Sequence, residues 1–205
     1  MRLPSWLLIK LSGKKHIEIG DRKLHPPLQF LLKLTENLVT DFTTLTPEQF
    51  RAAYIEQSKI SAKMPTGIKW KDHEIEVLKG KIFIREYHSK KIKENGPSLV
   101  YFHGGGWVIG DIETHHQLTA YICDKLGAKV FSVDYRLSPE FKYPIPLDDC
   151  NAAFDWVYSN AESLGLDKDR ISAGGDSAGG NLTAALCLKR KEENKSLPKV
   201  QLLLY

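Results

Sequence analysis

The sequence predicts an α/β fold, with a mostly parallel sheet covered by helices on both faces and a helical segment before it. From residue 97 onward, short and almost continuously apolar stretches alternate with stretches of helical periodicity. This alternation is typical of parallel strands that are buried on both faces. Residues 1–64, in contrast, have helical spacing without the alternation. We therefore divide the chain into an N-terminal helical segment, residues 1–64, and a core, residues 65–205.

The N-terminal segment contains two predicted helices. Apolar residues recur at helical spacing in residues 26–39, which read PPLQFLLKLTENLV. The second helix is predicted to begin after Thr46. Thr46 can serve as its N-cap, Pro47 would occupy the first helical position, and Gln49 follows three residues after the cap. Pro65 and Gly67 then mark the boundary with the core.

The core begins with a predicted hairpin over residues 73–89, in which two alternating strands join at Lys79-Gly80. Further strands are predicted at residues 97–102, 128–135, 170–175 and 200–205, and helices at 115–126, 147–158 and 178–191. Sites in such sheets lie outside the carboxyl ends of the strands. Both glycine-rich runs of the chain fall at such ends.

Composition narrows the classes of function. The net charge of +4 is spread over 29 basic and 25 acidic residues, without the basic stripe that is typical of nucleic-acid-binding proteins. No apolar run reaches the length of a membrane span, and the first residues lack a secretory apolar region. We therefore expect a cytoplasmic protein without stable membrane insertion. The 3 cysteines are far apart and no CxxC or HExxH spacing occurs, so we expect free thiols, no metal site and no cofactor.

The first glycine-rich run follows a predicted strand and reads His103-Gly104-Gly105-Gly106-Trp107. Consecutive glycines cost backbone entropy and need a reason. One reason is a tight exit from the strand, and another is a backbone that exposes its N–H groups to a ligand. The run lacks the Lys-Ser/Thr pair of a phosphate-binding Walker A loop and does not open directly into a helix as a dinucleotide fingerprint does.

The second run, residues 173–182, reads AGGDSAGGNL and has the G-x-S-x-G pattern centred on Ser177. A predicted strand precedes it and a predicted helix follows, as in a nucleophile elbow, where a serine lies on a sharp turn. The glycines at 175 and 179 leave room for that turn. The backbone N–H of Ala178 would point into the same space as the serine hydroxyl, and the loop N–H groups could bind the same oxyanion.

Four motifs in this order, HGGGW, DYRLSPE, GDSAGGN and the earlier LTPEQFRAAY, resemble the bacterial hormone-sensitive-lipase-like esterases of the α/β-hydrolase fold, in their GDSAG branch. The resemblance implies that Ser177 is the nucleophile, and that Ala178 and two of Gly104, Gly105 and Gly106 form the oxyanion hole. It implies that His103 positions the loop, that residues 1–64 form a cap, and that the substrate is a small, short-acyl ester. A homo-oligomer is compatible with the sequence. We interpret Asp134, Arg136 and Glu140 as structural residues that tie a turn together.

The chain departs from this family after Ser177. α/β-Hydrolases place the triad acid and histidine after the serine, yet residues 178–205 contain neither His nor Asp. The last residues read as an apolar strand without a covering element. We therefore expect that the C-terminal part of the core is missing, that the reading frame after codon 205 encodes the missing triad members, and that residues 1–205 alone are inactive. Two alternatives remain open: a ligand-binding, receptor-like protein on the same fold, and an unstable gene fragment.

Overall fold

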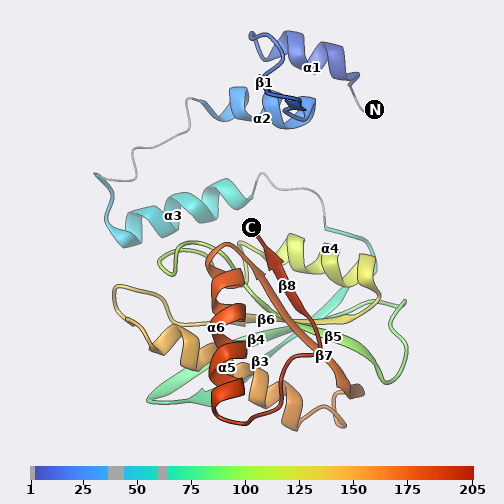
Figure 1. Cartoon of the computed structure of the whole chain (residues 1–205), viewed down its shortest axis with the longest axis vertical. Coiled ribbons are helices and arrows are strands. Elements are labelled where there is room, and N and C mark those ends of the chain that lie inside the picture. The colour runs from blue at the N-terminus through green and yellow to red at the C-terminus, as the bar shows by residue number, and fades with distance from the viewer. Residues whose placement is uncertain (1–2, 37–43, 60–63) are drawn as a thin grey trace. The chain divides into compact units, whose positions relative to one another are not determined.

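The computed structural model describes residues 3–36, 44–59 and 64–205. The chain forms two compact units, Met1–Leu45 and Thr46–Tyr205 (Figure 1). The division between the two units thus lies between Leu45 and Thr46, earlier in the chain than the boundary predicted between residues 64 and 65. The predicted boundary adjoins residues 60–63, which the structure does not describe. The assignment of residues 1–64 to a cap stays a prediction.

The first unit consists of two helices joined by a small hairpin. Helix α1 spans Ser5–Leu11, strands β1 (Glu18–Ile19) and β2 (Arg22–Lys23) pair antiparallel, and α2 spans Pro26–Thr35. Gln29 is buried in this unit, where its side chain donates to Ser12 Oγ and to the Lys15 carbonyl and accepts from the Ile17 N–H. The sequence predicted α2, whose predicted continuation over residues 37–39 lies outside the described residues. It did not predict the hairpin, which has only two paired residues on each strand.

Helix α3 spans Pro47–Ser58 and opens the second unit with the predicted capping box, in which Thr46 and Gln49 exchange two hydrogen bonds. Arg51 ties this helix to two loops of the core. Its guanidinium donates to the carbonyls of Val108 and Ser138 and binds both carboxylate oxygens of Glu140 at 2.9 and 2.7 Å. The interpretation of Glu140 as a residue that ties a turn is consistent with this contact.

The second unit contains a six-stranded sheet in the order β3-β4-β6-β5-β7-β8 (Figure 1). Its strands are β3 (Lys69–Val77), β4 (Gly80–His88), β5 (Gly96–Phe102), β6 (Lys129–Asp134), β7 (Leu166–Asp176) and β8 (Gln201–Leu204). The first two form the predicted hairpin, which turns at Leu78-Lys79, and the last four run parallel. This arrangement confirms the predicted mostly parallel α/β sheet.

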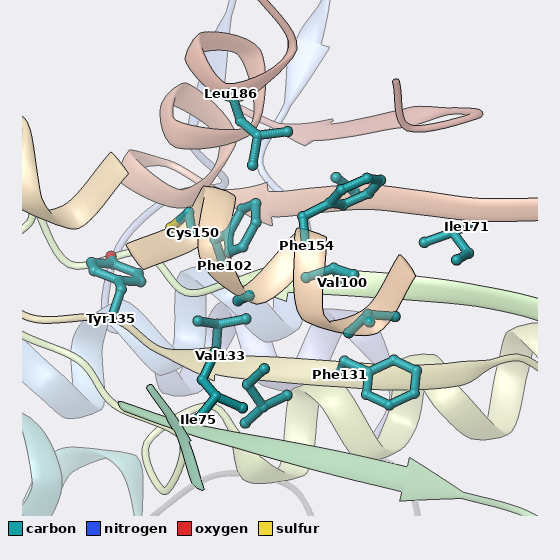
Figure 2. Close-up of a cluster of buried hydrophobic side chains, with 14 of the residues drawn as sticks. Ile75, Val100, Phe102, Phe131, Val133, Tyr135, Cys150, Phe154, Ile171 and Leu186 are labelled. Carbon is teal, nitrogen blue, oxygen red and sulfur yellow. The ribbon is translucent and has the colours of Figure 1, made fainter. Parts of the chain in front are cut away.

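Helices cover both faces of this sheet, as predicted. Helices α5 (Ile145–Ser159) and α6 (Ala178–Glu192) bury side chains such as Phe154 and Leu186 against Val100 and Phe102 (Figure 2). Helix α4 (His116–Leu126) packs Ala120 and Cys123 against the other face, beside Leu99 and Tyr101. Strand β5 thus alternates its side chains between two apolar cores. Within the described residues, no helix is both long enough and apolar enough to cross a membrane.

The chain order changes direction between β5 and β7. From β5 the chain crosses through α4 to β6 on one side, whereas β7 lies on the other side of β5. Such a switch point, at the carboxyl ends of parallel strands, leaves a crevice where ligands bind. Phe102 lies opposite Gly175 in the register of the two strands, so both glycine-rich runs leave the sheet at this point.

Candidate active site

Ser177 lies on the sharp turn between β7 and α6. Its backbone has φ 51° and ψ −115°, a conformation that costs a non-glycine residue energy and is held by its surroundings. The Ser177 N–H donates to the carbonyl of Leu204 on β8 at 2.8 Å, and the residue is exposed. A Cβ atom on Gly175 or Gly179 would collide with the carbonyl oxygen of Phe102. The two glycines therefore let α6 approach β5 closely enough to form the turn.

The loop after β5 lies beside this turn. The Gly104 N–H is already bound, since it donates to Asp176 Oδ1 at 3.0 Å. Gly105 and Gly106 have φ values of 124° and 60°, which favour glycine. Among the described residues, no acceptor binds the N–H groups of Gly105, Gly106 or Ala178. Of the four predicted oxyanion donors, these three thus have an N–H group without an acceptor, whereas Gly104 does not.

Asp176 joins the serine turn to this loop. Its Oδ1 accepts from the Tyr101 hydroxyl at 2.6 Å as well as from Gly104, and its Oδ2 lies 3.6 Å from His115 Nε2. Burial opposes ionisation of this carboxyl, but the interactions with His115 and Tyr101 outweigh burial and lower its pKa to about 2. Asp176 is therefore a fixed anion beside Ser177. Its role was not predicted from the sequence, although its position inside the GDSAG motif was a signal.

His103 is fully buried beneath the same loop. Burial and the nearby His115 lower its pKa to about 4, so the ring is neutral at pH 7. Its Nδ1 lies 2.8 Å from the Gly104 carbonyl, to which it donates, and the ring stacks on Tyr135 with centroids 4.3 Å apart. The Tyr135 hydroxyl donates to the His103 carbonyl at 2.7 Å. These contacts support the predicted positioning role of His103.

No base accompanies the serine in the described part of the chain. Ser177 Oγ has no hydrogen-bond partner there, and the histidines nearest in sequence to the glycine loop bind other groups: His103 binds Gly104, and His115 faces Asp176. Within the same residues, no cluster of three His, Cys, Asp or Glu side chains could hold a metal ion. The site thus combines an exposed hydroxyl with free N–H donors, without a group that could take the serine proton.

Replacing Tyr101 with Phe should destabilise the fold at pH 7 by about 1.5–3 kcal/mol, because a hydrogen bond to a charged group is lost. The pKa of Asp176 lies below its reference value of 3.8, so its ionised form stabilises the fold above that pH. This contribution disappears as the pH falls towards 2. Urea denaturation should therefore show a smaller difference between wild type and Tyr101→Phe at pH 3 than at pH 7. The control is Tyr121→Phe, at a half-exposed position on α4; an equal Tyr101→Phe effect at both pH values would contradict the role of Asp176.

Comparison with known proteins identifies the family. Residues 99–205 match the family described by the alpha/beta hydrolase fold. The chain is 34% identical over 203 residues to the carboxylic ester hydrolase LipN of Mycobacterium tuberculosis, covering 95% of this chain and 54% of that protein. It is 38% identical over 160 residues to an arylesterase of Saccharolobus solfataricus, covering 78% and 52%.

A solved esterase structure is also similar to this chain. The hyperthermophilic esterase of Pyrobaculum calidifontis matches with a TM-score of 0.80 and 33% identity, over 88% of this chain and 58% of that one. The chain thus spans about half the length of the curated relatives that it matches. With the sheet order, the elbow and the glycine loop on the same edge, these matches show that the chain belongs to the α/β-hydrolases, in the family of carboxylic ester hydrolases that resemble hormone-sensitive lipase.

Proposed function

We propose that Ser177 is the nucleophile of a carboxylic ester hydrolase that acts through an acyl-enzyme. The observation that carries the proposal is the exposed Ser177 on a turn that Asp176 binds to the glycine loop, together with backbone N–H groups without acceptors in that turn and loop, those of Ala178, Gly105 and Gly106. Preorganised donors of this kind stabilise the negative charge that develops on a carbonyl oxygen under attack, and removing one typically costs roughly 10²–10³-fold in turnover.

In this reaction, Ser177 Oγ attacks the ester carbonyl carbon and loses its proton to a base, while the carbonyl oxygen takes up negative charge. Collapse of this intermediate breaks the bond to the alcohol, which leaves with a proton and gives the acyl-serine. Water then attacks the acyl-serine and releases the acid. Since the chain contains no His or Asp after Ser177, we further propose that residues 1–205 hold the nucleophile and oxyanion donors but lack the triad acid and base.

An apolar hollow beside the turn supports a short-acyl substrate. It has a volume of about 280 Å³, and its walls include Leu182 and Ala185 of α6, Leu147 of α5 and Trp107 directly after the glycine loop. Ala178, Leu182 and Ala185 follow one another at helical spacing on one face of α6. A hydrocarbon chain of an ester bound at Ser177 could therefore extend along this face.

Phosphonylation tests the assignment of Ser177. We expect a p-nitrophenyl alkylphosphonate to label Ser177 in preference to other exposed serines at alkaline pH, where hydroxide can take the serine proton. Mass spectrometry of peptides would locate the label, and Ser177→Ala should lose it while the exposed-site control Ser163→Ala keeps it. Equal labelling of several serines, unchanged in Ser177→Ala, would overturn the proposal. A related ester hydrolase from a lake metagenome has been solved with a phosphonate derivative, which makes this reagent class a suitable probe.

A further inference from the structure

A second cleft, of about 500 Å³, lies between α3, the beginning of β4, the end of β6 and the loop after it. Neither Ser177 nor the glycines at 104–106 line it. Its walls are partly apolar, with Ile55 from α3, Phe83 from β4 and Leu137 and Phe141 from the loop. Six charged side chains also line it, and their partners decide which ligand the cleft can accept.

The cationic side chains of this cleft are already neutralised. Arg51 binds Glu140 through two hydrogen bonds, and Arg136 binds Asp149 in the same way. Lys81 lies 2.6 Å from Glu74 on the neighbouring strand. None of these three cations is therefore left to attract an anionic ligand.

The carboxylates of Asp111 and Asp134 have no such partner. Within the described residues, no Lys, Arg or His nitrogen lies within 4.0 Å of either of them. Asp111 uses one oxygen to accept the Thr114 N–H at 2.6 Å. Burial, together with the charge of Asp111, raises the pKa of Asp134 to about 6. The Ile112 N–H and the charge of Arg85 offset only part of this effect on Asp134. Two carboxylates thus line the cleft with no cation of the described residues in contact with them.

An aromatic ring lies next to this negative charge. Phe83 pairs with Asp134 across the antiparallel β4–β6 ladder, and directly opposed residues on neighbouring strands point to the same face of the sheet. The Phe83 side chain is 44% exposed. Organic ammonium ions bind where a carboxylate supplies charge and an aromatic face supplies cation–π attraction.

We propose that this cleft binds a small organic ammonium ion, whose charged group lies by Asp134 and Asp111 and whose hydrocarbon part contacts Phe83 and the apolar wall. Charge complementarity favours this ligand, because the cations of the cleft are paired with carboxylates while Asp111 and Asp134, in the part of the chain that the structure describes, have no cation within 4.0 Å. A metal ion is a poorer match, since no group of three metal-ligating side chains exists among the described residues. The proposal does not depend on the role of Ser177.

Benzylammonium tests the proposal on the complete 205-residue chain. In an NMR titration at pH 8, we expect saturable shifts of backbone amides in residues 81–83 and 110–111, at least tenfold stronger binding than for the neutral benzyl alcohol, and no binding of benzoate at this site. Asp134→Asn should weaken benzylammonium binding about tenfold or more. The control is Asp169→Asn, which removes an exposed carboxylate that does not line the cleft and should leave binding unchanged. Ser177→Ala should bind as the wild type does, which separates this result from the test of the nucleophile.

The wild-type protein provides a second measurement if Asp134→Asn does not fold. Protonation of Asp134 removes a negative charge, so benzylammonium affinity should fall as the pH is lowered from 8 to 5, while benzyl alcohol binding stays constant. The charged groups that act on Asp134 or line the same cleft are Asp111, Glu113, Arg85, Arg51, Lys81, Arg136 and Glu140. Equal affinity for the ammonium and the alcohol, an affinity independent of pH, or shifts confined to residues around Ser177 would each overturn the proposal.

Discussion

The 205-residue chain should hydrolyse p-nitrophenyl butyrate no faster than its Ser177→Ala variant. No residue in the described part of the chain lies in position to take the proton from Ser177 Oγ, and residues 178–205 contain no histidine. In another triad hydrolase, loss of the histidine costs about 10⁶-fold in turnover, with oxyanion stabilisation and binding providing what remains. Release of p-nitrophenolate, measured for both proteins at equal concentration, would give the Ser177-dependent rate directly.

Ser177-dependent turnover well above the rate in buffer would contradict this expectation and would require a base that the structure does not place at the serine. A circular dichroism spectrum and a thermal transition of each protein should accompany the assay, so that an unfolded chain is not taken for an inactive one. Stabilisation by an ester that is not hydrolysed would favour the receptor-like alternative. A broad transition with poor solubility would favour the unstable fragment.

Gly179→Ala should destabilise the protein by at least about 3 kcal/mol, the upper part of the range for overpacking a close-packed site. An added Cβ would collide with the Phe102 carbonyl oxygen and would also approach the His103 carbonyl. Both atoms belong to the backbone of β5 and its loop, so neither can rotate out of the way. For a chain of this size the loss corresponds to a decrease in Tm of roughly 6–12 °C, which differential scanning calorimetry would measure.

Gly180→Ala is the matched control on the same helix. Its Cβ would lie 3.2 Å from the Gly175 carbonyl oxygen and no closer to any other atom, and replacing a helical glycine by alanine contributes about 0.5–1 kcal/mol of stability. We expect the two effects to offset each other within about 1 kcal/mol. If Gly179→Ala were as stable as Gly180→Ala, α6 could not lie as close to β5 as described. The geometry of the Ser177 turn would then be contradicted as well.

Local patterns in the sequence were sufficient to predict most elements of the second unit. The apolar run at β5 and the alternation of the β3–β4 hairpin are periodic over several residues, and the capping box at Thr46 is a contact between residues three apart. The β1–β2 hairpin was missed because two paired residues per strand are too few for a period to show. The GDSAG turn was predictable because its glycines are required by the strand–turn–helix geometry that they form.

The sequence by itself determined the fold class, the candidate nucleophile, the glycine loop and the lack of a histidine after Ser177. Only the tertiary structure decided which donors of that loop are free, since the Gly104 N–H is bound by Asp176, 72 residues further along the chain. The same holds for Asp134, because its burial and the charges of Asp111, Glu113 and Arg85, which raise or lower its pKa, come from segments distant in the sequence. A motif can identify residues that act through their own backbone, whereas hydrogen bonding, burial and charge pairing depend on neighbours that only folding brings together.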